Sequence, residues 1–322
     1  MNRALRKKYL TESCLLWVAL AIGVFSFCWF RVWVVGELDT AQFRQIIDLL
    51  PKDWRKFSPV DFDWLVSYLG RTSLTLDEPM LVMLVTGWAM IRGSDVVSGE
   101  LSRGSMELLL SQPISRRAFY ISHALWTLAL LLILVGLAWL GMSLGIWFTS
   151  VTETSFPELK IPLVDYRIPL RFLVARSETI AMASVVNPLS FLPGVVNLLC
   201  LGVMFGGLAA CCSACDRYRW RTLGIVAGFY FANAGLKLLG MASEKFHWVV
   251  NFSVFGLYSP AAAIERAQND VGSIWGIWKT NAAGEIIAGG TLLNCGLLLG
   301  LGIAFYVAGA VVFERRDLPA PV

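Results

Sequence analysis

The sequence predicts an all-α polytopic membrane protein with six transmembrane helices and an N-terminal interfacial helix. Of the 322 residues, 57% are hydrophobic and only 16% are charged, whereas about a quarter of the residues of soluble domains are charged. The hydrophobic residues form uninterrupted runs of about 20 or more, long enough for helices to cross a hydrocarbon core of roughly 30 Å. Because the runs do not alternate in polarity, they favour helices over the strands of a β-barrel.

The apolar runs give the expected spans, which are about residues 14–35, 80–97, 119–148, 188–214, 222–242 and 286–313. The first run follows Arg3, Arg6, Lys7 and Lys8, as a signal peptide would. However, the run is too long for a signal peptide and no small-residue cleavage site follows it, so we expect an uncleaved first helix. Residues 1–13 are expected to form the interfacial helix, lying on the membrane surface.

Basic residues predict the orientation of the spans. One set of polar segments consists of residues 1–13, 98–118, 215–221 and 314–322. Counted together with Arg92 and Asp95, this set carries thirteen Lys or Arg and seven Asp or Glu. The other set has a much lower density of basic residues: residues 36–79, 149–187 and 243–285. The positive-inside rule therefore places both termini in the cytoplasm of a multi-pass protein of the inner cell membrane. The three outer segments contain amphipathic stretches and are expected to form small helices or a cap.

Several enzyme classes are disfavoured because their motifs are missing. The chain contains no G-x-x-x-x-G-K-[ST], no H-E-x-x-H and no G-x-S-x-G, and its two histidines, His123 and His247, lie far apart. We therefore expect no catalytic cluster, no metal site and no cofactor. The acidic residues fall outside the apolar runs or near their ends, which also argues against coupling to an ion gradient. Energy for any transport would come from another chain.

Four polar residues lie within the spans or at their ends and are candidates for a substrate path or gate. Arg92 and Asp95 are three residues apart, so they form either a hinge at an inner gate or a local ion pair. Asn233 and Lys237 are one turn apart in the fifth span. They either line a path, or Lys237 snorkels to the surface while Asn233 bonds between helices. Gly-x-x-x-Gly pairs are expected mainly to pack helices within the subunit: Gly141–Gly145, Gly202–Gly206, Gly224–Gly228 and Gly296–Gly300.

The inner loop, residues 98–118, is expected to form a short helix followed by a turn. Arg103 and Glu107 are four residues apart and can pair across one helical turn. Pro113 ends that helix, and Ser115 is a suitable N-cap for the next helix, which begins at Arg116. From the spacing alone, the loop either contacts a partner or is a solvated basic loop that only sets the topology.

This loop resembles that of ABC-2 type permeases, the membrane subunits of ABC exporters whose ATPase is a separate protein. Glu100, then residues 103–110 (RGSMELLL) and 112–116 (QPISR), resemble the family pattern E…RGT-x-E-x-LL…P-[VI]-S-R. Ser105 and Met106 stand where Thr and Leu are commoner. Residues 313–318 (FERRDL) are similar to the F-x-R-R-D-L with which many members end.

The resemblance implies that residues 1–322 form a single ABC-2 transmembrane domain and that residues 100–111 form a coupling helix seated in a cleft of a separate ABC ATPase. It assigns that contact to Glu100, Arg103, Gly104, Glu107, Leu108, Leu109, Pro113 and Arg116. It also implies an exporter with two permease subunits, as a homodimer or heterodimer, and two ATPase subunits in the lipid bilayer, with no nucleic-acid partner. Two alternatives remain open: a membrane scaffold that holds a soluble partner, and an ion-coupled secondary transporter.

Overall fold

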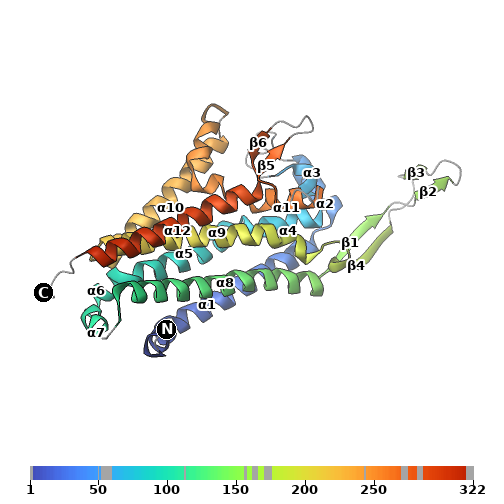
Figure 1. Ribbon diagram of the computed structural model, residues 1–322. Helices are drawn as coiled ribbons and strands as arrows, with labels where there is room; N and C mark the ends of the chain where they lie inside the picture. Colours follow the sequence, from blue (N-terminus) through green and yellow to red (C-terminus); the bar gives the residue numbers. More distant parts are fainter. Residues whose placement is uncertain are drawn as a thin grey trace.

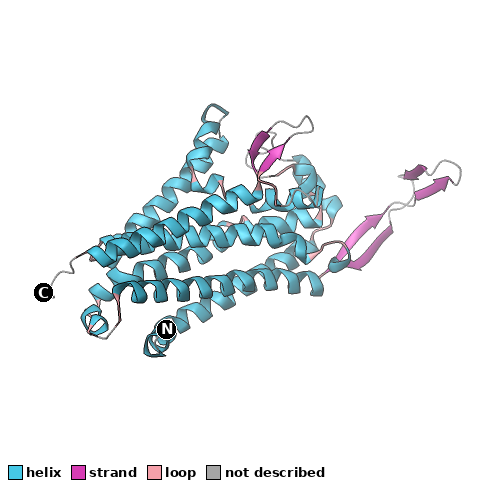
Figure 2. Ribbon diagram, viewed as in Figure 1, coloured by secondary structure: helices cyan, strands magenta, loops and turns pink. Residues whose placement is uncertain are grey.

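The computed structural model describes residues 3–49, 51, 60–111, 114–155, 158–161, 166–169, 176–242, 244–269, 275–280 and 286–316. It is largely helical (Figure 2). Within these residues, six helical segments are long and apolar enough to cross a membrane: Ser13–Glu37, Tyr68–Ser102, Arg116–Phe148, Pro188–Cys215, Arg219–Ala242 and Thr291–Arg315. The predicted class, an all-α polytopic membrane protein, is therefore confirmed.

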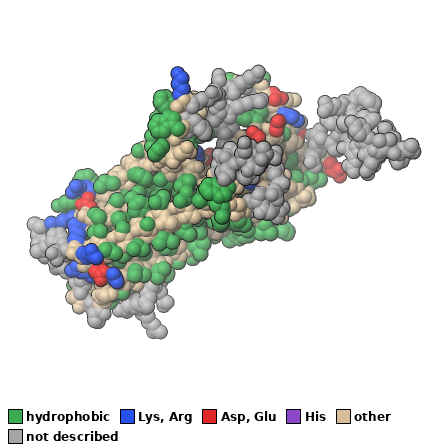
Figure 3. Space-filling model, turned by 45° about the horizontal axis from the view of Figure 1, so that its top comes forward, with side chains coloured by type: hydrophobic (Ala, Val, Ile, Leu, Met, Phe, Trp, Pro, Cys, Tyr) green, Lys and Arg blue, Asp and Glu red, His purple; other side chains and the backbone are tan. Residues whose placement is uncertain are grey.

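The long helices form one bundle (Figure 1). These helices are α1 (Arg3–Glu37), α5 (Pro79–Ser94), α8 (Arg116–Phe148), α9 (Leu192–Cys215), α10 (Arg219–Ala242) and α12 (Thr291–Arg315). Both chain ends lie at one end of this bundle, beside the connection between α5 and α8. Lys and Arg side chains gather at this end, whereas the sides of the bundle are mainly hydrophobic (Figure 3). We call this end, with Arg103, Arg116, Arg117, Arg219 and Arg316, the basic end, and the opposite end the cap end.

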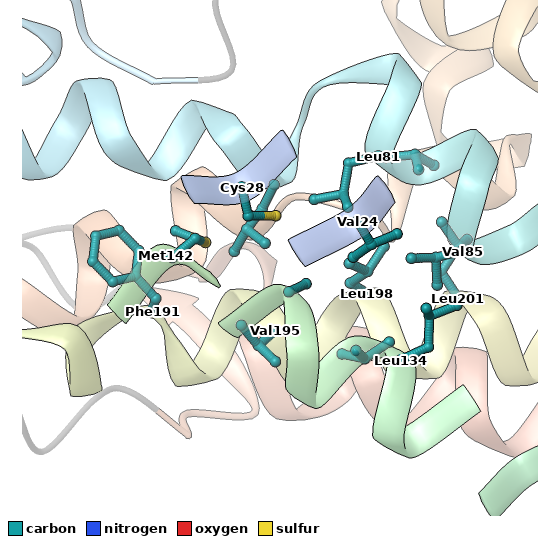
Figure 4. Packing of buried hydrophobic residues seen from close by; sticks show 14 of the residues in the cluster. Val24, Cys28, Leu81, Val85, Leu134, Met142, Phe191, Val195, Leu198 and Leu201 are labelled. Carbon is teal, nitrogen blue, oxygen red and sulfur yellow. The ribbon is translucent and has the colours of Figure 1, made fainter. Parts of the chain in front are cut away.

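Helix α9 lies at the centre of the bundle, where it packs against α5, α8, α10 and α12. Its buried Leu198 and Leu201 belong to one cluster with Val24 of α1, Val85 of α5 and Leu134 of α8 (Figure 4). Because neighbours cover all of its faces, α9 is apolar all round rather than amphipathic. The surrounding helices leave large hydrophobic side chains exposed, such as Leu132, Ile133, Leu297, Ile303 and Val307. Such surfaces suit contact with lipid tails.

Close helix contacts depend on glycine at two of the predicted Gly-x-x-x-Gly pairs. A Cβ atom at Gly141 would lie 2.6 Å from the carbonyl oxygen of Phe25 in α1, and one at Gly206 would lie 2.8 Å from the hydroxyl of Tyr306 in α12. The prediction of internal packing is thus confirmed for Gly141–Gly145 and Gly202–Gly206. The other two pairs do not pack within the subunit, because no described residue lies within 4 Å of such an atom at Gly224, Gly228, Gly296 or Gly300.

The tightest contact between α9 and α12 gives a testable prediction. A Cβ atom at Gly207 would lie 2.4 Å from the carbonyl oxygen of Gly302. We expect Gly207→Ala to lower the free energy of unfolding by about 1–3 kcal/mol, because the two backbones must separate. Thermal unfolding in detergent measures the change. Gly136→Ala in α8 is the matched control, because nothing lies within 4 Å of its added Cβ. Equal effects of the two substitutions would contradict this packing.

The cap end contains short helices, as expected, and they come from all three outer segments and from the start of the fourth span. They are α2 (Thr40–Leu49), α3 (Phe62–Leu65), α4 (Tyr68–Ser73), η2 (Leu74–Leu76), η4 (Met182–Ser184), η5 (Pro188–Phe191), η6 (Glu244–Phe252), η7 (Val254–Gly256) and α11 (Pro260–Asn269). Arg71 of α4 is buried, stacks on Phe43 and Tyr68, and donates to the Leu38 carbonyl at 2.7 Å. This arginine therefore joins the α1–α2 connection to the second span.

The second outer segment differs from expectation because it forms strands. The sheets among the described residues are antiparallel pairs: β1 (Ser150–Ser155) with β4 (Arg176–Ala181), β2 (Glu158–Ile161) with β3 (Tyr166–Pro169), and β5 (Trp278–Thr280) with β6 (Ile286–Gly289). Residues 150–155 (SVTETS) alternate and are rich in β-branched side chains, which favours a strand. The sixth span begins at Thr291 rather than at residue 286, because β6 and Gly290 precede it.

The first helix is longer than its span. Helix α1 runs without a break from Arg3 to Glu37, and the span within it covers Ser13–Glu37, so residues 3–12 extend the same helix before the span. These residues contain neither glycine nor proline, the two residues that most often end a helix. The span begins at Ser13, close to the predicted start at residue 14.

Candidate functional site

The connection between α5 and α8 forms the tip of the basic end. The last turn of α5 widens into the π-helix η3 (Asp95–Gly99), which is followed by α6 (Glu100–Ser102) and α7 (Met106–Leu110). Between α6 and α7 the chain turns at Gly104, whose φ of 71° lies in the left-handed region that favours glycine. The predicted single helix is therefore interrupted at this turn, and the Glu107 side chain of the predicted Arg103–Glu107 ion pair lies outside the described residues.

Arg103 instead joins a cluster of charged side chains below the turn. Asp95 accepts hydrogen bonds from Arg92 at 3.1 Å and Arg103 at 3.0 Å, and Arg219 of α10 lies 3.4 Å from it. Arg103 also donates to Glu100 at 2.9 Å. Asp95, Glu100 and Arg92 are all buried. The predicted Arg92–Asp95 ion pair is confirmed, and the structure extends it to two further arginines.

This charged cluster connects several helices at the basic end. Arg92 lies 3.2 Å from Nε2 of His123, a buried residue of α8. Burial lowers the pKa of the Arg103 guanidinium, and Asp95 and Glu100 raise it by more, so that its pKa lies above the usual value. Arg103 therefore stays charged at physiological pH. A displacement of the turn would reach α5, α8 and α10 through these contacts.

A cluster of buried hydroxyl groups supports the π-helical turn. Ser213 of α9 accepts from the backbone N–H groups of Val97 at 3.1 Å and Ser98 at 2.9 Å. The Ser98 hydroxyl lies 3.0 Å from that of Ser213 and 3.3 Å from that of Thr222 in α10. A π-helical turn widens the regular hydrogen-bond ladder, and Ser213 satisfies two of its donors. Sequence reasoning missed this cluster, because no local pattern distinguishes these hydroxyl residues from others.

Helix α7 has one buried and one exposed apolar side. Met106 is buried in a second cluster, with Val97, Phe119 and Phe313. Leu109 packs partly against the same cluster, whereas the Leu108 side chain is 73% exposed. The side chain of Glu107 and the whole of Pro113 lie outside the described residues. Thus Met106 anchors α7 to the bundle while Leu108 points away from it.

The two sequence motifs, far apart in the chain, meet at this end. Arg116 donates to the Arg316 carbonyl at 2.8 Å, and Arg117 pairs with Glu314 at 2.6 Å. Arg316 in turn donates to the Ala214 carbonyl at the end of α9 at 2.8 Å. The tail after α12 therefore ties together the ends of α8, α9 and α12. Ser115 accepts from the Ala118 N–H at 3.2 Å, so its predicted role as N-cap of α8 is confirmed.

The remaining two candidates, Asn233 and Lys237, lie towards the cap end of α10. Asn233 is buried and accepts from the Val254 N–H at 3.0 Å, so it joins α10 to η7. Lys237 donates to the Tyr258 carbonyl at 3.0 Å instead of snorkelling to the membrane surface. It lines a cavity of about 480 Å³ between α5 and α10, whose wall is apolar except for Lys237, Asp77 and two tyrosines. The structure therefore does not bring these residues near Arg92 and Asp95.

Comparison with known proteins agrees with this geometry. A family described as "ABC-2 family transporter protein" matches residues 16–318 of the chain. The matched region contains all the spans from α5 to α12 and the connection between α5 and α8. It also contains the motif of residues 313–318 at the end of α12. A search of curated proteins found no match.

Proposed function

The chain belongs to the ABC-2 transporter family, and from this premise we propose that it is the permease subunit of an ATP-driven exporter. It is a multi-pass membrane protein. In this proposal the ATP is hydrolysed by a separate ABC ATPase, and the chain itself catalyses no reaction. The substrate crosses the inner cell membrane between the helices of two permease subunits.

One observation supports the coupling role most strongly, which is that α7 is anchored on one side and exposed on the other. Met106 is 2% exposed, whereas Leu108, two residues later, is 73% exposed. An exposed leucine at the tip of a polar connection can insert into an apolar cleft of the ATPase. A loop that served only to set topology would need neither the buried Met106 nor the exposed Leu108. We therefore assign ATPase contact to Arg103, Gly104, Glu107, Leu108 and Leu109.

The charged cluster would transmit the motion. When the ATPase subunits close on ATP, α7 and the turn at Gly104 move, and Arg103 carries that motion to Asp95. Asp95 in turn contacts Arg92 in α5 and Arg219 in α10. We propose that this pairing forms the gate at the basic end, and that Lys237 and its cavity belong to the substrate path at the cap end. Asn233 has a structural role in this proposal.

The orientation follows from charge. The basic end holds both termini and the cluster of Lys and Arg (Figures 1 and 3), which the positive-inside rule places in the cytoplasm. The same end must face the cytoplasm for an ATPase to reach α7. Open surfaces beside Gly224 and Gly228 on α10, where nothing lies within 4 Å of an added Cβ, would allow a helix of the second permease subunit to approach closely.

Affinity purification of the tagged chain from native membranes tests the proposal. We expect an ATPase with a P-loop to co-purify, and its ATP hydrolysis in liposomes to change when this subunit is present. A soluble partner without nucleotide hydrolysis would support the scaffold instead. Flux driven by an ion gradient in the absence of nucleotide would support a secondary transporter. Either of the last two results would overturn the proposed function.

A further inference from the structure

A pocket of about 310 Å³ opens beside the charged cluster at the basic end. It is lined by Ser13 and Leu16 of α1, Ile91 and Arg92 of α5, and Asp95, Arg103 and Arg219. Three separate spans and the turn after α6 thus contribute to its wall. Leu108 does not line it, whereas Arg103 both lines it and belongs to the surface assigned to the ATPase, so the pocket adjoins that surface.

The wall of the pocket has an excess of positive charge and of hydrogen-bond donors. Three guanidinium groups face one carboxylate, because Arg92, Arg103 and Arg219 all approach Asp95 within 3.4 Å. Glu100 balances part of the charge of Arg103 from behind. The Nε atom of Arg219 is buried and has no hydrogen-bond partner within the described part of the chain. A planar guanidinium group with a spare donor, as in Arg219, matches the oxygens of a phosphate group.

The position of the pocket matches the headgroup level of a bilayer. The spans formed by α1 and α10 begin at Ser13 and Arg219, which are both lining residues. Trp220 beside Arg219 is 73% exposed, as is common for aromatic residues at a membrane interface. Leu16 and Ile91 give the pocket an apolar side towards the bundle, where an acyl chain could run along α1. Basic pockets between helices at this level are suited to anionic lipid headgroups.

We propose that this pocket binds the phosphate group of an anionic phospholipid from the leaflet at the basic end. The phosphate oxygens accept from Arg219 and Arg103, whose side chains are partly exposed, while Asp95 keeps both side chains in place. Bound lipid would hold α1, α5 and α10 together beside the proposed gate. Free inorganic phosphate offers the same oxygens without the acyl chains, so the test includes it as a separate ligand.

Native mass spectrometry of the full chain, purified in detergent and freed of lipid, measures the binding. We expect adducts with phosphatidylglycerol and far fewer with phosphatidylcholine at the same concentration. Arg219→Gln should weaken the phosphatidylglycerol adduct about tenfold, the factor expected for losing one charge-assisted contact. Arg221→Gln is the matched control, because Arg221 lies on the same helix, pairs with Asp216 and does not line the pocket. Equal adducts in the two variants would overturn the proposal.

A second pair of variants leaves the arginines untouched and so covers a failure of Arg219→Gln to fold. Leu16→Glu places a negative charge at the pocket and should reduce phosphatidylglycerol binding. Leu15→Glu, at a side chain that is 87% exposed and does not line the pocket, should leave binding unchanged. Thermal unfolding compares inorganic phosphate with phosphatidylglycerol. If both raised the melting temperature equally, the lipid assignment would be overturned. Equal binding of phosphatidylglycerol and phosphatidylcholine would overturn it too.

Discussion

Asp95→Asn is expected to lower the free energy of unfolding of the detergent-purified protein by about 3 kcal/mol, the scale for removing one partner of a buried ion pair. The substitution removes the charge that Arg92, Arg103 and Arg219 share. Arg92, which is 3% exposed, would lose the negative charge that lies 3.1 Å from it. We also expect ATP-driven transport to be lost, because the turn at Gly104 would no longer be fixed to α5.

Asp63→Asn is the control for this substitution. The Asp63 side chain is 96% exposed and lies 3.7 Å from Arg44, which is itself 64% exposed. Exposed ion pairs contribute little to stability, so this variant should melt at the temperature of the unsubstituted protein and transport normally. If Asp95→Asn were equally harmless, the charged cluster could not be the connection between the turn and the spans.

Leu108→Asp is expected to abolish transport while leaving the permease folded. Burial of a leucine at an interface contributes about 1.5–3 kcal/mol, so the amount of co-purified ATPase should fall at least about tenfold. An aspartate at this position would add the cost of burying a charge in an apolar cleft. Because the Leu108 side chain is 73% exposed in this subunit, its melting temperature should not change. Co-purification and thermal unfolding, measured on the same preparation, give both results.

Two further variants make this experiment specific. Tyr218→Asp alters an exposed side chain, 47% accessible, in the other short connection at the basic end, and should leave ATPase binding intact. Met106→Asp alters the buried side of α7 and should destabilise the permease itself. Unchanged ATPase recovery with Leu108→Asp would contradict the assignment of α7, whatever the other variants do.

The class of fold could be predicted from the sequence because long apolar runs have few physical alternatives. Within a bilayer, backbone polar groups must be satisfied inside the segment, so such runs form helices. The boundaries were less predictable. Residues 3–13 could extend the first helix because nothing breaks it, and the sixth span starts only after β6, whose Ile286–Gly289 is as apolar as the span itself. The strands β1 and β4 could not be predicted with the same certainty, because a six-residue alternating stretch such as Ser150–Ser155 is a much weaker signal than a long apolar run.

The candidate site could be located from its motif, but its internal contacts could not. The i, i+4 spacing of Arg103 and Glu107 suggests an ion pair only if the helix continues, and the left-handed Gly104 stops it. Arg219 reaches Asp95 from a helix more than a hundred residues further along the chain, and no local pattern indicates that contact. No local pattern indicates the hydrogen bond between Arg116 and the Arg316 carbonyl either, because it forms only where the start of α8 lies beside the end of α12.

The most direct test of the account is a photoactivatable cross-linking residue at position 108 in native membranes. We expect a covalent adduct between this subunit and an ATP-binding protein that carries a P-loop, and a much weaker adduct when the same cross-linking residue is placed at position 218. Cross-links to lipid alone, or to no protein at all, in membranes that still carry out ATP-driven transport would contradict it.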